Sequence, residues 1–226
     1  DLIAQGVDGI ALAPTDPNAL APVVDSAIAQ GIPVVFVDTR GTNEGVSFIG
    51  TNNQVGAALA AQYMCDNLEA GSDVAILQGL ISQSTGQQRA QGAHDGLTEC
   101  GLNIVAEQPA NWDRAMGLSV AETILAGNPN IKGIFASNDN MALGAVEALK
   151  QAAMLESVMV VGFDANPDAA NSIIAGEMTA SIAQAPDNMG RFGIESLIAL
   201  NNGETIEEWV DTGTVLVDAS NAADYQ

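Results

Sequence analysis

The chain has 226 residues, 47% of them hydrophobic and 15% charged, so it is globular rather than disordered and long enough for one large domain or two lobes. Six basic residues against 28 acidic ones give a net charge of −22, which would repel a phosphate backbone and argues against nucleic acid as a partner. No apolar run approaches the roughly 18–20 residues of a membrane-spanning helix.

The chain opens on "DLIAQG", which predicts the last turn of a helix closed by Gly6. Short apolar runs then alternate with stretches of helical spacing. The predicted strands are Gly9–Ala13, Pro33–Val37, Val46–Ile49, Val74–Gln78, Asn103–Gln108, Gly133–Ala136, Val158–Gly162 and Thr179–Ala183. The predicted helices are Pro17–Gln30, Gln54–Leu68, Gly86–Glu99, Asp113–Ala126, Met141–Gln151 and Asp187–Leu200. This alternation predicts an α/β fold with a parallel sheet and helices on both faces.

Three of these strands end in an Asn or Asp side chain. "GIPVVFVD", "IKGIFASND" and "ESVMVVGFD" place Asp38, Asn138 and Asp164 at strand ends. In open parallel sheets ligands bind outside the carboxyl ends of the strands, but Asn and Asp also cap the helices that follow. Each side chain therefore either caps a helix or faces a ligand, and the run from Asn138 to Asn140 holds enough polar groups for both.

The motifs of common nucleotide-binding and hydrolytic sites are missing. The chain has no Gly-x-Gly-x-x-Gly, no P-loop and no Gly-x-Ser-x-Gly. The one histidine, His94, cannot build a metal site alone, and "DANPD" lacks the Gly and Glu that complete a calcium loop. We therefore expect no metal, no cofactor and no catalytic group, although Asp38 and Asp164 leave a carboxylate pair open. Cys65 and Cys100 form either one bridge between two helices or two buried thiols.

The polar residues of the strand ends and loops share a chemistry that suits hydroxyl groups. Carboxylates accept hydrogen bonds from hydroxyls, amides both donate and accept, and arginine donates in a fixed fork. The set comprises Asp38, Arg40, Arg89, Trp112, Asn138, Asp164 and Gln184. Trp112, in the polar stretch "PANWDR", either offers a flat apolar face to a ligand or packs on a neighbouring helix. Many hydrogen-bonding groups with one apolar face favour a small polyhydroxylated molecule.

The chain resembles the periplasmic sugar-binding proteins of ABC transporters, in the ribose-binding branch of the type I periplasmic-binding-protein fold. The matching stretches are "PTDPNAL", "GIPVVFVDT", "IGTNNQVGAALAAQYM", "QPANWDR", "FASNDNMALGAVEAL", "VMVVGFDANPDA" and "TASIAQAPDNMG". Their order and spacing run from residue 1 to about residue 217, which makes the resemblance far more specific than any single motif.

The resemblance implies two doubly wound parallel-sheet lobes joined by a hinge of three crossovers, near 50–52, 183–185 and 212–215. The N-terminal lobe would comprise residues 1–51 and 185–213, and the C-terminal lobe residues 52–184 and 214–226. The family begins with a βαβ unit that has no counterpart here. We therefore expect the first lobe to lack that unit, either because the chain is a fragment or because another piece completes it.

The resemblance also implies the ligand-binding residues. Asp38, Arg89, Asn138, Asp164 and Gln184 would hydrogen-bond the sugar, Trp112 would stack on it, and Asp139 or Asn140 would cap the next helix. The family's "DR" reads "DT" here, with Arg40 one position later, so its arginine fork is lost or displaced. This departure argues against ribose itself and favours another pentose, a pentitol, a tetritol or a furanose signalling molecule.

By this resemblance the protein is an extracytoplasmic receptor, bacterial or archaeal, that delivers a small sugar or polyol to an ABC permease. Its signal segment lies outside the chain, and it meets the membrane only through the permease or a lipid anchor outside the chain. One alternative is the effector core of a LacI-type transcription regulator, which would need a basic helix-turn-helix ahead of residue 1. An enzyme on the same scaffold and a chemotaxis or quorum-sensing receptor are the others.

Overall fold

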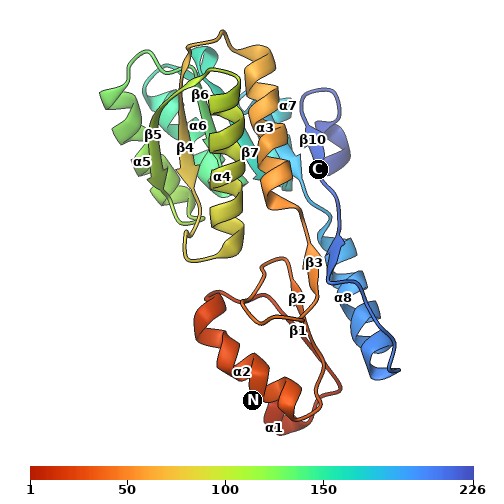
Figure 1. Ribbon diagram of the computed structural model, residues 1–226. Helices are drawn as coiled ribbons and strands as arrows, with labels where there is room; N and C mark the ends of the chain where they lie inside the picture. The colour runs from red at the N-terminus through yellow and green to blue at the C-terminus, as the bar shows by residue number, and fades with distance from the viewer. The chain divides into compact units, whose positions relative to one another are not determined.

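A computed structural model describes all 226 residues of the chain (Figure 1). The chain forms two compact units, each built from separate stretches of sequence. Unit 1 comprises residues 1–52, 82–85 and 185–213, and unit 2 comprises residues 53–81, 86–184 and 214–226. Residues 82–85, assigned from the sequence to the C-terminal lobe, pack in unit 1 instead. The predicted α/β class, with helices flanking parallel sheets, is confirmed.

Unit 1 has a parallel four-stranded sheet in the order β1-β2-β3-β9. Its strands are β1 (Ile10–Leu12), β2 (Val34–Val37), β3 (Phe48–Gly50) and β9 (Trp209–Asp211), and its helices are α1 (Leu2–Gln5), α2 (Pro17–Ala29) and α8 (Pro186–Asn201). The Asp16 carboxylate starts α2 by accepting from the backbone N–H groups of Asn18 and Ala19, each at 2.9 Å. Gly6, with φ of 65°, ends α1 as predicted.

Both faces of this sheet are covered because buried side chains alternate along its strands. Val34, Phe36 and Phe48 pack with α1 and α2 on one face. Val35 and Ile49 point to the other face, where they meet α8. Burial of each large apolar side chain contributes roughly 1.5–3 kcal/mol. The two-residue period of the strands therefore produces a sheet with two cores.

Unit 2 has a six-stranded sheet in the order β10-β8-β7-β6-β4-β5. Its strands are β4 (Asp73–Gln78), β5 (Asn103–Pro109), β6 (Gly133–Ala136), β7 (Met159–Asp164), β8 (Ala180–Ala183) and β10 (Val215–Val217). Its helices are α3 (Asn53–Asn67), α4 (Ser84–Glu99, whose first two residues pack in unit 1), α5 (Arg114–Gly127), α6 (Asp139–Gln151) and α7 (Pro167–Ile174), with 3-10 turns at Leu155–Ser157 and Ala222–Tyr225.

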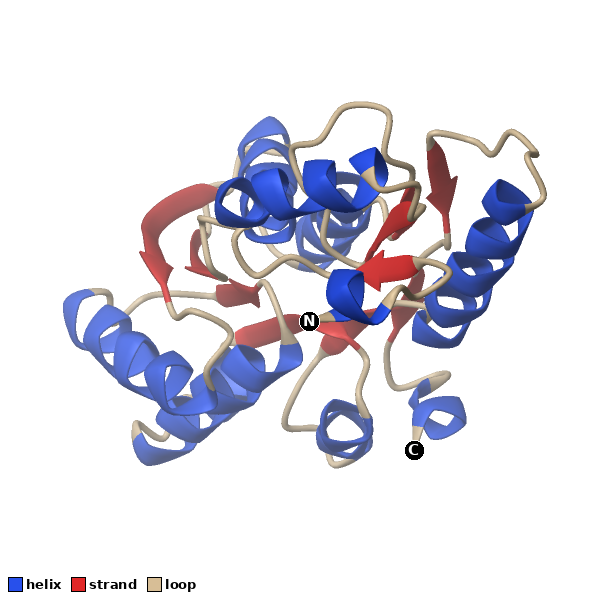
Figure 2. Cartoon of the chain, turned by 90° about the horizontal axis from the view of Figure 1, so that it is seen from below, coloured by secondary structure: helices blue, strands red, loops and turns tan.

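Helices cover both faces of this sheet as well (Figure 2). Residues of α3 and α4 pack against Ile76, Phe135 and Phe163 on one face. Residues of α5, α6 and α7 pack against the other face, around Leu77 and Ile134. None of the helices combines the length and apolar character that crossing a membrane requires.

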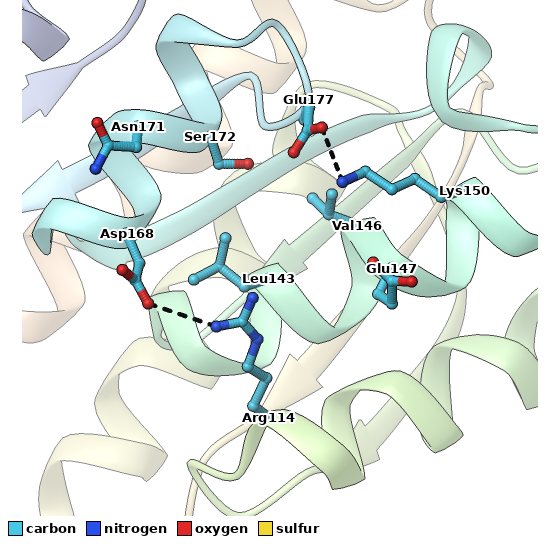
Figure 3. A pocket seen from close by; sticks show the side chains of 9 residues that line it. All are labelled: Arg114, Leu143, Val146, Glu147, Lys150, Asp168, Asn171, Ser172 and Glu177. Atoms are coloured by element: carbon cyan, nitrogen blue, oxygen red, sulfur yellow. Dashed lines mark hydrogen bonds and ion pairs between the residues drawn. The ribbon is translucent and has the colours of Figure 1, made fainter.

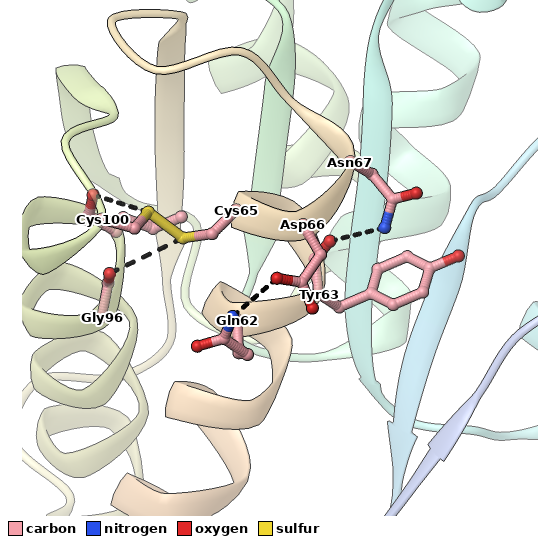
Figure 4. The surroundings of a disulfide bond; sticks show 8 residues. Gln62, Tyr63, Cys65, Asp66, Asn67, Gly96 and Cys100 are labelled. Atoms are coloured by element: carbon pink, nitrogen blue, oxygen red, sulfur yellow. Dashed lines mark hydrogen bonds between the residues drawn. A yellow bond between two sulfur atoms is a disulfide. The ribbon is translucent and has the colours of Figure 1, made fainter.

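A disulfide joins Cys65 on α3 to Cys100, one residue after α4 (Figure 4). Of the two alternatives left by the sequence, the bridge is therefore correct and the pair of free thiols is wrong. The two helices lie side by side on one face of the sheet, with a Cα–Cα distance of 6.1 Å between the cysteines. The bond closes a segment of 35 residues and so fixes the pair of helices.

The strands β9 and β10, the helix α7 and the two 3-10 turns were not predicted from the sequence. The strands β9 and β10 border the crossover expected near 212–215, and β10 pairs antiparallel with β8, so the sheet of unit 2 is not wholly parallel. The helix α7 begins at Pro167 behind its cap, Asn166, whose side chain accepts from the Ala169 N–H at 3.0 Å. "DANPD" is therefore a helix start.

Candidate functional site

The candidate site lies at one edge of the sheet of unit 2. Trp112 follows β5, Asn138 follows β6, Asp164 ends β7 and Gln184 follows β8. The strands β8, β7, β6, β4 and β5 are all parallel, so their carboxyl ends meet at this edge. Arg89 reaches the same edge from α4. The structure therefore brings together five of the six predicted ligand-binding residues.

Arg89 lies at the centre of this group and is only 3% exposed. Its Nε donates to Asn53 Oδ1 at 2.8 Å, and its Nη1 donates to the Ser137 carbonyl at 2.8 Å and to Asp164 Oδ1 at 3.1 Å. The guanidinium also stacks on Phe163, with Cζ 3.7 Å from the ring centroid. A buried arginine needs such partners, because an isolated buried charge is very costly.

Asp164 is the exposed member of this network, with 32% of its side chain accessible. Its Oδ1 accepts from Arg89 and also from Gln184 Nε2, at 2.6 Å. These two donors come from α4 and from the end of β8, so the carboxylate is fixed from two sides. A carboxylate that is fixed yet partly exposed is suited to accepting hydrogen bonds from hydroxyl groups of a ligand.

Trp112 gives the edge an apolar surface. Its ring lies directly against Gly79, where any added Cβ would overlap the indole, and Arg89 Cζ is 5.6 Å from the ring centroid. The Asn138 side-chain amide donates to the Trp112 carbonyl at 3.4 Å, which links the ends of β5 and β6. The Trp112 ring therefore packs beside the polar network. Asn111 and Trp112 both have a left-handed backbone conformation.

The backbone is strained at three of the predicted ligand-binding residues. Asp38, Trp112 and Asp164 have φ values of 66°, 66° and 116°, in a region that few non-glycine residues adopt. Among non-glycine residues, only Asn111, Ala153 and Ala165 share this feature, and two of these adjoin the three. Strain of this kind costs about 1–3 kcal/mol per residue and concentrates at functional sites.

Asp38, the sixth predicted ligand-binding residue, belongs to unit 1 and follows β2. Its N–H donates to the Ile49 carbonyl at 3.0 Å, and its carbonyl accepts from Thr85 Oγ1 at 3.4 Å. Arg40, the displaced arginine of the "DT" variant, forms an ion pair with Glu208 at 2.8 Å. Its fork is thus engaged by a surface carboxylate.

A separate pocket of about 310 Å³ lies among α5, α6 and α7 of unit 2 (Figure 3). It is lined by Arg114, Leu143, Val146, Glu147, Lys150, Asp168, Asn171, Ser172 and Glu177. Arg114 pairs with Asp168 at 3.5 Å and Lys150 pairs with Glu177 at 2.8 Å, so its basic groups are already compensated. None of the six predicted ligand-binding residues lines it. No group of three or more His, Cys, Asp and Glu side chains is arranged to hold a metal ion.

Residues 1–205 match the model of the periplasmic binding protein domain. The chain belongs to this family. A ribose import binding protein of Bacillus subtilis is 37% identical over 212 residues, which are 93% of this chain and 68% of the relative.

Solved periplasmic binding proteins have the same fold. A solute-binding protein of Actinobacillus succinogenes with bound D-allose aligns with a TM-score of 0.94 and 34% identity, over 99% of this chain and 83% of that one. A solute-binding protein of Burkholderia graminis in complex with D-arabinose aligns with a TM-score of 0.94 and 32% identity, over 100% and 80%. The resemblance drawn from the sequence is therefore confirmed.

In this periplasmic binding protein the helix cap after β6 differs from the prediction. Asn138, not Asp139 or Asn140, caps α6, because its extended backbone lets its Oδ1 accept from the Met141 N–H at 3.0 Å. The expected cap at Asp139 or Asn140 is wrong, since both residues are already helical. Asn138 still has its Nδ2 group at the site edge, so one side chain combines the cap with a hydrogen bond to the loop of Trp112.

Asp139, expected from the sequence only as a helix cap, lies beside the site in a different role. It is fully buried, its Oδ1 accepts from Ser181 Oγ at 2.6 Å, and its Oδ2 accepts from the Asn166 N–H at 2.8 Å. Burial and then the charge of Asp164 raise the pKa of Asp139 to about 8, although these hydrogen bonds and Arg89 favour the ionised form. A surplus of polar groups in "SNDN" was the only signal in the sequence.

Proposed function

We propose that this periplasmic binding protein captures a small sugar or polyol outside the cytoplasm and delivers it to an ABC permease, without catalysing a reaction. The relatives named for ribose import, and the similar structures with D-allose and D-arabinose, support the ligand class and the transport role. They are binding proteins, which supports the absence of an activity.

One observation carries the proposal for the site. The Asp164 carboxylate is partly exposed and is fixed by Arg89 and Gln184, beside the flat ring of Trp112. We propose that Asp164, Arg89, Asn138 and Gln184 bind hydroxyl groups and that Trp112 covers an apolar face of the ring. We propose Asp38 as the ligand-binding residue of the other lobe, with the lobes at 1–51 plus 185–213 and 52–184 plus 214–226, apart from residues 82–85, which pack in unit 1.

The ion pair of Arg40 with Glu208 bears on which sugar binds. This contact turns one guanidinium nitrogen of Arg40 to Glu208, and Thr39 stands where the family's "DR" has its arginine. We therefore propose that the ligand is recognised mainly by carboxylates and amides, which suits an uncharged pentose, a furanose or a pentitol rather than an anionic sugar. The net charge of −22 also disfavours an anionic sugar, since it repels anions.

Titration calorimetry with D-ribose, D-allose, D-arabinose, ribitol and erythritol tests the proposal. We expect at least one of them to bind, and Asp164→Ala to weaken that binding about 10- to 100-fold, because a charged acceptor of hydrogen bonds is lost. Asp168→Ala is the matched control, since its carboxylate lies in the same unit but is 74% exposed and lines the separate pocket. Equal affinity of the Asp164 and Asp168 variants would contradict the assigned site, and no binding by any compound would contradict the ligand class.

A further inference from the structure

The segment that carries Asp164 has a strained backbone, which does not by itself hold the carboxylate in place. After β7 the backbone takes positive φ at two successive non-glycine residues, 116° at Asp164 and 52° at Ala165, before Asn166 caps α7. Such a conformation persists only where surrounding groups over-determine it. The groups that hold this segment therefore also decide where the Asp164 carboxylate points.

Two buried side chains hold the segment from beneath. Ser181 Oγ, on β8, accepts from the Ala165 N–H at 3.0 Å and donates to Asp139 Oδ1 at 2.6 Å. Asp139 Oδ2, in the first turn of α6, accepts from the Asn166 N–H at 2.8 Å. Both side chains are fully buried, so water does not replace these bonds. Two consecutive backbone N–H groups are thus bound by one connected pair of side chains.

The chain makes room for this pair at Gly162. A Cβ there would overlap Asp139 Oδ1, so any larger residue in the middle of β7 would displace the carboxyl group. The backbone of β7 therefore lies directly against Asp139. The same space also receives the Met178 methyl group, so Gly162 accommodates the apolar core as well as the buried carboxyl group.

We propose that Asp139 and Ser181 form a positioning pair, which holds the strained segment 164–166 so that the Asp164 carboxylate is aimed at the ligand. This inference rests on the proposed function of Asp164. Neither residue touches the ligand. They act through the backbone of residues 165 and 166, and α6 and β8 are the rigid elements that carry them.

The charged groups around Asp139 and Ser181 indicate which protonation state of Asp139 holds the segment 164–166. Asp164, on β7, and Arg89, on α4, are the charged groups that act on Asp139, and burial together with Asp164 raises its pKa to about 8. The raised pKa favours the protonated form of Asp139, whose hydroxyl donates to Ser181 Oγ in place of the bond that the ionised carboxylate accepts. An asparagine reproduces the neutral acid, because its Oδ1 accepts from the Asn166 N–H and its Nδ2 donates to Ser181 Oγ.

Four variants separate positioning from a general loss of stability. Asp139→Asn keeps both hydrogen bonds, Asp139→Leu removes them at similar volume, and Ser181→Ala removes the acceptor of the Ala165 N–H. Ser172→Ala is the matched control for Ser181→Ala, because its hydroxyl is also buried but has no hydrogen-bond partner.

The first readout is hydrogen exchange of the Ala165 and Asn166 amides at pH 7, which needs no sugar. We expect about tenfold faster exchange in Ser181→Ala and Asp139→Leu than in Ser172→Ala, and exchange close to that of the unmodified chain in Asp139→Asn. Unchanged exchange in Ser181→Ala and Asp139→Leu would overturn the inference, and so would equally fast exchange in Asp139→Asn.

The second readout is affinity for the sugar of the calorimetric panel that binds the unmodified chain, measured at a temperature where every variant is folded. We expect Asp139→Leu and Ser181→Ala to bind about tenfold more weakly, and Asp139→Asn and Ser172→Ala within about threefold of the unmodified chain. Faster exchange without any loss of affinity would overturn the positioning role. If no panel sugar binds the unmodified chain, the proposed function fails, while the exchange data still decide whether the pair holds the segment.

Discussion

Replacing Arg89 with methionine tests whether the buried network at the edge of unit 2 is built as described. Methionine keeps an unbranched stem on Phe163 but removes the hydrogen bonds to Asn53, to the Ser137 carbonyl and to Asp164. Removal of one member of a buried ion pair costs about 3–5 kcal/mol. Because 32% of the Asp164 side chain is accessible to water, we expect a smaller loss of about 2–4 kcal/mol.

Urea denaturation followed by the fluorescence of Trp112 measures this loss. The second tryptophan, Trp209, belongs to unit 1, so the experiment uses a Trp209→Phe background. Arg114→Met is the matched control, since its side chain is 56% exposed and its ion pair spans 3.5 Å, which predicts a cost under about 1 kcal/mol. If the midpoints of the two variants coincided, Arg89 would not be the centre of a buried network.

Three further outcomes are expected. Reduction of the Cys65–Cys100 bond, which closes 35 residues, should lower the free energy of unfolding by roughly 2–4 kcal/mol, so an unchanged urea midpoint in reductant would contradict a stabilising bridge. Gly79→Ala should displace the Trp112 ring and cost about 1–3 kcal/mol, visible as a shifted emission maximum, and an unshifted spectrum would mean that the ring does not lie there. Because the pKa of Asp139 is raised to about 8, the folded chain keeps a proton that the unfolded chain loses near pH 4. The free energy of unfolding, taken relative to that of Asp139→Asn, should therefore fall by up to about 1.4 kcal/mol per pH unit as the pH rises from 4 to 8. A difference that does not change with pH would show that Asp139 is ionised in the folded chain.

The βα alternation was predictable from the sequence because it rests on local periodicity. Runs such as "VVFV" and "GIFA" are strands in the structure, and Gly6 ends the first helix, because these features depend on a few neighbouring residues. The strands β9 and β10 were not predicted, since they hold few buried residues and gain their conformation from pairing with β3 and β8. Tertiary contacts, not propensity, decide such short elements.

The candidate site was predictable only as a collection of residue types. The sequence placed Asp164 at a strand end, but it gave no sign that Arg89, 75 residues earlier, pairs with it. It also gave no sign of positive φ at Trp112 and Asp164, because nothing local favours that conformation in either residue. The exchange of roles between Asn138 and Asp139 was undecidable for the same reason, since a shift of one residue in the helix start changes which of them is the cap.

Unit 1 is assembled from both ends of the sequence, and this sets an order for biosynthesis. The strand β3 is complete at Gly50, but its partner β9 is not translated until residue 211, 161 residues later. At translation rates of about 5–20 residues per second, that delay is roughly 8–30 s, during which one edge of the sheet and the face awaiting α8 stay uncovered. By Ala183 all but one strand of the sheet of unit 2 has been translated, so this sheet is nearly complete before β9 is made. Until α8 and β9 are made, the growing chain therefore leaves Val35, Ile49 and the free edge of β3 without their partners.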